Sequence, residues 1–182
     1  MSNPIVYDKA TFHAESVQHE GLPEHQASVH TSMYLGWLIE SDLVSDPFAS
    51  ESKDLIQQFK SRQITAAKIY AHWDHCLVED MLNEQGNAFT QAYFDFDRGQ
   101  FLSDYEQALG AELPSLFHVE DTWDNYDRLK AQIDQRFDAW KGTVVEKEPV
   151  EEEPVAATSQ QVEAKEVPRD TKPKKKWWQI WK

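Results

Sequence analysis

A chain of 182 residues with a formal net charge of −14 and a single cysteine is long enough to bury one hydrophobic core without disulfides. The lone Cys76 has no disulfide or CxxC partner, and the longest unbroken apolar stretch, residues 33–39, is far shorter than the roughly 20 residues of a membrane span. Such a negative charge opposes contact with a phosphate backbone, which excludes ordinary nucleic-acid binding. Because residues 1–10 also lack a signal-peptide pattern, we expect a cytoplasmic protein.

Charge and aromatic residues divide the chain into three predicted parts. Residues 1–142 hold 24 of the 32 acidic residues, only 10 of the 18 Lys and Arg, and all but three of the aromatic residues. They predict an acidic, mainly helical globular domain. Residues 143–172 contain no aromatic residue and are rich in Glu and Pro, a composition typical of a disordered linker. Residues 173–182 form a terminal Lys/Trp-rich motif.

The first clear helical pattern spans residues 28–41. Val29, Met33 and Trp37 recur at four-residue steps, and residues 34–39 leave little polar surface, so we expect this helix at the centre of the core.

Two further helices are predicted before residue 83. Asp46-Pro47 is interpreted as a breaker, after which a helix begins at Ser50 or Ser52. Another begins at Thr65 and reaches about residue 82, with Cys76 in its apolar stripe and therefore in the core.

The middle of the chain mixes turn and strand signals. Residues 83–87, Asn-Glu-Gln-Gly-Asn, are predicted to end the preceding helix, and residues 88–96 to form an extended segment or hairpin arm. A short helix over residues 101–109 follows a turn at residues 97–99.

A last helix is predicted from Trp123 to about residue 141. Its apolar residues recur at three- and four-residue steps, and Asp121 or Thr122 can cap its start. Together these patterns predict a mainly α domain of about five helices, with room for one short β element around residues 88–96.

Four separated blocks resemble an uncharacterised family of small bacterial proteins. They are YDKAxxH from Tyr7, HTSMYLGW from His30, NEQGNxF from Asn83 and HVEDTWxNY from His118. The resemblance covers about residues 5–140. It implies a bacterial origin and no established activity.

The candidate polar site comprises His13, His30, His118, Glu120 and Asp121. None of the seven histidines belongs to a recognised metal signature, so we expect no metal and no cofactor. The segment His118-Val-Glu-Asp121 could supply a general base, but its polar residues could equally bond the backbone at a helix start. The same residue types leave a metal-assisted hydrolase built on His13, His30 and His118 as the alternative function.

The leading interpretation is a non-enzymatic intracellular interaction protein. No nucleophile elbow, phosphate loop or dinucleotide motif is present. An acidic domain suits a basic protein partner, and by analogy a toxin-immunity role.

The terminal motif predicts docking to one of three targets: an anionic membrane surface, a partner groove, or the chain's own acidic domain. Peripheral attachment at the inner face of the membrane would follow from the first. The residues expected to carry this docking are Lys174, Lys175, Lys176, Trp177, Trp178, Ile180, Trp181 and Lys182.

Overall fold

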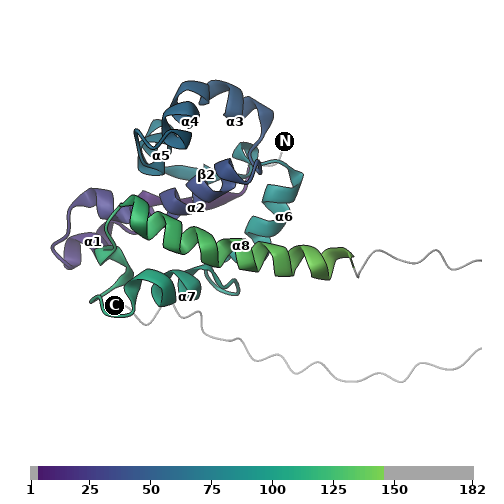
Figure 1. Cartoon of the computed structure of the whole chain (residues 1–182). Helices are drawn as coiled ribbons and strands as arrows, with labels where there is room; N and C mark the ends of the chain where they lie inside the picture. Colours follow the sequence, from purple (N-terminus) through teal and green to yellow (C-terminus); the bar gives the residue numbers. More distant parts are fainter. Residues whose placement is uncertain (1–3, 146–182) are drawn as a thin grey trace, which may run out of the picture. The chain divides into compact units, whose positions relative to one another are not determined.

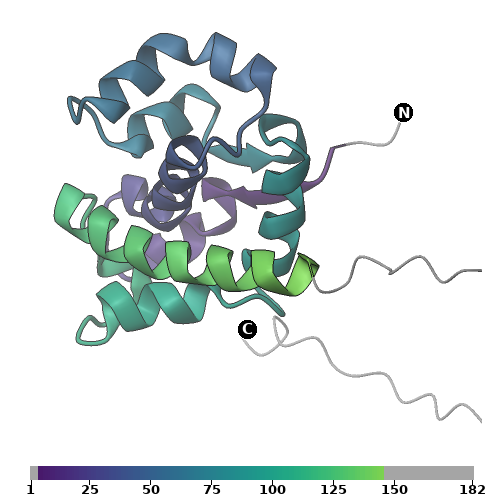
Figure 2. The same cartoon turned by 45° about the vertical axis from the view of Figure 1, so that its right-hand side comes forward.

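Helix α2 (Val29–Glu40) runs through the middle of the domain, and the other elements pack around it (Figures 1 and 2). The structure is a computed structural model, which describes residues 4–145. Every residue of α2 except Glu40 is buried, as expected for a helix that is apolar on nearly all sides. At Gly36 an added Cβ would lie 2.9 Å from both Ala66 and Phe59. The missing side chain therefore lets the neighbouring helices approach α2 closely.

The described chain is mainly helical, with one small sheet. Figures 1 and 2 show α3, α4 and α5 on one side of α2, and α7 and α8 on the other. In chain order the elements are β1 (Val6–Lys9), η1 (Ala10–Phe12), α1 (Ala14–His19), η2 (Glu24–Ser28), α2, α3 (Asp46–Glu51), α4 (Lys53–Lys60), α5 (Ala66–His72), β2 (Cys76–Val78), η3 (Glu79–Met81), α6 (Glu84–Tyr93), α7 (Phe101–Tyr105), the π-helical η4 (Glu106–Gly110), η5 (Leu116–His118) and α8 (Trp123–Val145).

Strands β1 and β2 form an antiparallel pair. Their register places Val6 opposite Val78, Asp8 opposite Leu77 and Lys9 opposite Cys76, with an irregularity between Val6 and Asp8. Of the four β1 residues only Asp8 is buried. The pairing therefore turns a carboxylate toward the interior.

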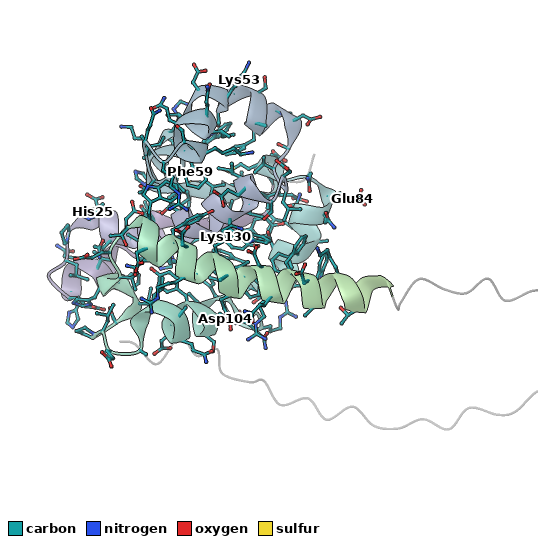
Figure 3. All side chains as sticks on the ribbon, in the orientation of Figure 1. His25, Lys53, Phe59, Glu84, Asp104 and Lys130 are labelled. Atoms are coloured by element: carbon teal, nitrogen blue, oxygen red, sulfur yellow. The ribbon has the colours of Figure 1, made fainter. Side chains whose placement is uncertain are left out.

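Aromatic side chains join the layers. Phe59 of α4 is buried and stacks on Trp123 at the start of α8, with ring centroids 5.2 Å apart. Figure 3 shows Phe59 on the inner side of α4, whereas Lys53 and Glu84 lie at the periphery. On the other side of α8, Arg136 forms two hydrogen bonds of 2.7 Å to the buried Asp104 of α7.

The two strongest helical patterns are confirmed. The segment predicted at 28–41 is α2, and Trp37 is fully buried. The predicted last helix is α8, which buries Tyr126, Leu129 and Ile133 and continues past residue 142 to residue 145. Of the two predicted caps, Thr122 is the one whose hydroxyl accepts a bond from the Asn125 amide, at 3.3 Å.

The strand prediction for residues 88–96 is wrong, because residues 84–93 form helix α6. Asn83 begins this helix, since its side-chain oxygen accepts a 2.8 Å bond from the Gly86 amide. Gly86 is not a helix terminator here. A Cβ at this position would lie 2.2 Å from the Leu43 carbonyl oxygen, so the glycine permits close contact between α6 and the residues after α2.

The long helix predicted from Thr65 is also wrong beyond His72. Asp74 and His75 have φ of 53° and 52°, and the chain turns there into β2. Cys76 consequently lies in a strand, half-buried, and its thiol contacts the Asp74 carbonyl oxygen. It is not in the buried core.

The interpretation of Asp46-Pro47 as a breaker needs correction as well. Pro47 lies in the first turn of α3, capped by Ser45, where its missing N–H has no helical partner to lose. The predicted helix from Ser50 or Ser52 is divided into α3 and α4 at Ser52.

Among residues 4–145, no helix combines the length and the apolar character needed to cross a membrane. The Lys/Trp motif of residues 173–182, and the linker predicted for 143–172 apart from its first three residues, lie outside the described residues.

Candidate metal centre

Asp8, His13 and His30 converge from three elements of the fold. Asp8 is the buried position of β1, His13 lies between η1 and α1, and His30 is in the first turn of α2. One ligand atom from each residue lies within 4.8 Å of the other two. We refer to these residues as the three-residue centre.

The Asp8 carboxylate is the hub of this centre. His13 Nε2 lies 2.8 Å from Oδ1, and His30 Nε2 lies 3.6 Å from Oδ2. The Thr31 hydroxyl donates to Oδ2. Burial alone would raise the pKa of Asp8, but hydrogen bonds from His13 and Thr31, together with the electrostatic influence of the neighbouring histidines, bring it below the usual value. The carboxylate is therefore ionised at neutral pH.

His30 is a neutral imidazole without a hydrogen-bond partner. Its side chain is 2% exposed, and burial lowers its pKa to about 4. Neither ring nitrogen has a hydrogen-bond partner among the described residues, whereas most buried polar side-chain atoms have one.

Aromatic rings fix the orientation of His30. The rings of Phe96, Phe117 and Tyr105 lie 6.1–6.2 Å from it, and that of His13 packs edge-on at 4.7 Å. The ring is therefore oriented by packing and not by a hydrogen bond from Nδ1 to another described residue, whereas the outer nitrogen of a metal-binding imidazole usually makes such a bond.

The donor types and spacings suit a transition-metal ion. Two neutral imidazole nitrogens and one carboxylate oxygen are ligands that zinc and related ions prefer, whereas Ca²⁺ and Mg²⁺ favour all-oxygen sites. Ligands about 2.0–2.1 Å from a tetrahedral ion lie roughly 3.3 Å from each other. The separations of 2.8 Å to Oδ1 and 3.6 Å to Oδ2 involve different carboxylate oxygens, and one ligand atom per residue lies within 4.8 Å of the other two, so the side chains would have to shift to bind one ion. It would replace the proton between His13 and Asp8.

The structure separates the other predicted site residues from this centre. His118 Nδ1 lies 3.3 Å from Glu20 Oε2 and 3.2 Å from the Ser115 hydroxyl. Glu120 is exposed, and its backbone carbonyl accepts a bond from Asn125.

Asp121 accepts a 2.6 Å bond from Thr65 and does not serve as the helix cap. Burial raises its pKa, against the opposing effects of Thr65 and His25. It lines a cavity of about 10 Å³. The predicted hydrolase set of His13, His30 and His118 is therefore only partly assembled, because Asp8 takes the third place.

Sequence reasoning selected two of the three residues and missed Asp8. Asp8 stands in the same block as His13, YDKAxxH, but nothing in that block marks it as buried. Recognising it requires the pairing of β1 with a strand about 70 residues later, which no local pattern supplies. The predicted docking residues from Lys174 to Lys182 lie outside the part of the chain that the structure describes.

Residues 6–119 match the family model described as "Domain of unknown function (DUF7832)". The match covers more than half of the chain, so the protein belongs to this family, in agreement with the expectation of an uncharacterised family. The whole three-residue centre lies within the matched segment. No curated protein and no solved structure matches the chain.

Proposed function

We propose that this domain is a metal-binding protein that holds one divalent transition-metal ion at Asp8, His13 and His30. The observation that carries the proposal is the convergence of three ligand atoms within 4.8 Å around a buried imidazole whose nitrogens have no partner. A buried polar group without a partner costs about 1–3 kcal/mol. A bound ion removes this cost for Nε2 of His30.

The same cluster could be a purely structural hydrogen-bond network. The bonds of Asp8 to His13 and Thr31 are explained equally well by that view. That network accounts less well for His30, whose Nε2 lies 3.6 Å from Asp8 Oδ2, just beyond hydrogen-bond distance, and whose Nδ1 has no partner among the described residues. A centre with three protein ligands is typical of catalytic zinc sites, in which a fourth position takes a water molecule. Hydrolysis is the reaction class that such an ion supplies.

The test is the metal content and affinity of untagged full-length protein. We expect about one ion per chain by elemental mass spectrometry, and d–d absorption bands on titration with Co²⁺. His13 is the one ligand with appreciable exposure, 18%. Loss of an outer-shell partner weakens metal binding roughly 10–100-fold, so loss of this ligand in His13→Ala should weaken Zn²⁺ binding by more than that. His25→Ala is the matched control, since His25 is exposed and outside the centre.

Equal affinity of the His13→Ala variant and the wild type would show that the ion binds elsewhere and would overturn the proposal. A His118→Ala variant examines the alternative ligand set. Unchanged metal content in that variant would exclude His118 as a ligand.

A second proposal concerns interaction with a partner, and the distribution of charge supports it. The 24 acidic residues against 10 basic ones in residues 1–142 would speed encounter with a basic protein, as in a toxin-immunity role. A pull-down from the native host with residues 1–142 and with the full-length chain tests this. One stoichiometric basic protein on both baits supports it, and recovery of no specific protein contradicts it.

For the Lys/Trp motif we propose weak binding to anionic membranes. Its four Lys residues gain about 1 kcal/mol each near anionic lipid, and Trp favours the headgroup region. Full-length protein should co-sediment with phosphatidylserine vesicles at low salt and less at high salt. Changing Trp177, Trp178 and Trp181 to Ala should abolish this. Equal partitioning of the wild type and the triple-Trp variant onto vesicles would contradict membrane binding. It would favour docking of the motif onto a protein surface.

A further inference from the structure

We infer that a metal ion enters and leaves the three-residue centre on the His13 side, and that a contact between α1 and η5 controls the rate. This contact, which we call the latch, consists of Glu20, Ser115 and His118. The inference rests on the proposed metal binding and adds a means of regulating it.

His13 is the ligand through which solvent reaches the centre. Its side chain is 18% exposed, against 1% for Asp8 and 2% for His30. It is also attached to the least anchored element. Asp8 is held by the pairing of β1 with β2, and His30 belongs to a helix buried along nearly its whole length. Helix α1, which begins directly after His13, buries Val17 alone. Movement of α1 is therefore the cheapest way to open the centre.

Phe117 covers the same side. Its ring lies 5.8 Å from that of His13 and 6.1 Å from that of His30, and it belongs to η5. The backbone of this turn is held by the buried Gln26, whose side-chain amide donates to the carbonyl oxygens of Phe117 and Val119. The ring of Phe96 lies 6.1 Å from both histidine rings. An ion passing His13 must therefore displace the ring of Phe117, the ring of Phe96 or the start of α1.

The latch joins these two parts. Glu20 directly follows α1, and its Oε2 accepts a 2.5 Å bond from the Ser115 hydroxyl. His118 Nδ1 lies 3.3 Å from the same oxygen. Ser115 also caps η5 by accepting from the Phe117 amide. One carboxylate thus ties the helix that carries His13 to the turn that carries Phe117. None of the three latch residues belongs to the centre.

The latch is partly exposed, with side-chain exposures of 26% for His118 and 27% for Glu20. Exposed contacts of this kind are weak enough to break often. They therefore suit control of a rate, while the buried ligands determine the affinity.

The experiment measures release of Zn²⁺ from loaded full-length protein into excess chromophoric chelator. Glu20→Ala should speed release by about three- to tenfold, as expected for loss of a charge-assisted hydrogen bond in a partly exposed site. Its equilibrium affinity for Zn²⁺ should stay within about twofold of wild type, because association accelerates as well. Ser115→Ala should give a similar rate, and the double variant should show non-additivity.

Glu112→Ala is the matched control, since it removes the same charge from an exposed turn outside α1. Its release rate should equal that of the wild type. If Glu20→Ala and Glu112→Ala release Zn²⁺ at the wild-type rate, the latch is wrong and metal binding stands. If Glu112→Ala accelerates release as much as Glu20→Ala, net charge is the cause and the latch is wrong. If wild-type protein retains no Zn²⁺, both proposals fall.

Discussion

Asp121 shows how one half-buried carboxyl affects the stability of this domain. Burial raises its pKa above the usual value near 3.8, so the folded protein holds the proton more tightly than the unfolded chain does. A group of this kind favours folding fully below its unfolded pKa, and this contribution is lost as the pH rises through its folded pKa. At neutral pH the half-buried charge of Asp121 therefore opposes folding.

We accordingly predict that Asp121→Asn stabilises the domain at pH 7 by up to about 1 kcal/mol. The amide oxygen can still accept the bond from Thr65. The gain should shrink as the pH falls toward 4, which urea denaturation at the two pH values would measure. Asp124→Asn, an exposed change in the first turn of α8, should instead destabilise slightly. A loss of stability on Asp121→Asn at pH 7 would mean that the charge has a partner worth more than its burial costs.

The side chain of Trp37 contributes to stability mainly through the packing of its ring. Its ring is fully buried among Tyr34, Phe89 and Phe137, and its Nε1 donates to Asp134 at 2.8 Å. Trp37→Ala should lower the free energy of unfolding by about 3–5 kcal/mol. Asp134→Ala removes this hydrogen bond and the i,i+4 ion pair with Lys130 at 3.1 Å while it keeps the ring, and it should cost about 1–2 kcal/mol. Similar losses for the two variants would contradict the packing role of the ring.

Among the secondary-structure elements, α6 begins with residues whose local sequence pattern does not decide between the start and the end of a helix. Asn83 with Gly86 three residues later can end a helix or begin one. The close contact of Gly86 with Leu43, from a distant segment, decides that the pair begins α6. The turn after α5 gave no glycine signal, because Asp74 and His75 adopt positive φ without one. By contrast, α2 and α8 carry apolar spacings long enough to be predicted. The centre follows the same rule, since His13 and His30 stood out by residue type while Asp8 depends on strand pairing.

Two glycine substitutions provide a prediction at this scale. Gly86→Ala should destabilise the domain by more than about 2 kcal/mol, because the new Cβ would lie 2.2 Å from a backbone oxygen and force α6 away from it. Gly142→Ala in α8 meets nothing within 4 Å. It should be neutral or stabilise by up to about 1 kcal/mol. Thermal denaturation of the two variants checks both signs, and equal effects would show that the contact of α6 with Leu43 is misplaced.

In the domain as a whole, the three-residue centre brings together β1, α1 and α2, which are anchored to the rest of the fold in different ways. β1 is paired with β2, α1 is lightly anchored, and α2 is the core. An ion bound to all three would cross-link them in the folded state and would have no preformed site in the unfolded chain. Metal binding is thus expected to stabilise folding of the whole domain and to order α1 most.

We therefore predict that Zn²⁺ at 100 times its dissociation constant raises the free energy of unfolding by about 2.7 kcal/mol. For a domain of this size the melting temperature should rise by roughly 5–10 °C. His25→Ala should show the full shift, and a chelator should reverse it. His13→Ala should show almost none, although its metal-free melting temperature should itself be lower than that of wild type, because the buried Asp8 carboxylate loses its 2.8 Å bond to His13. An equal shift in the His13→Ala variant would mean that Zn²⁺ stabilises the protein through another site, and the three-residue centre would then be a hydrogen-bonded core cluster without a metal.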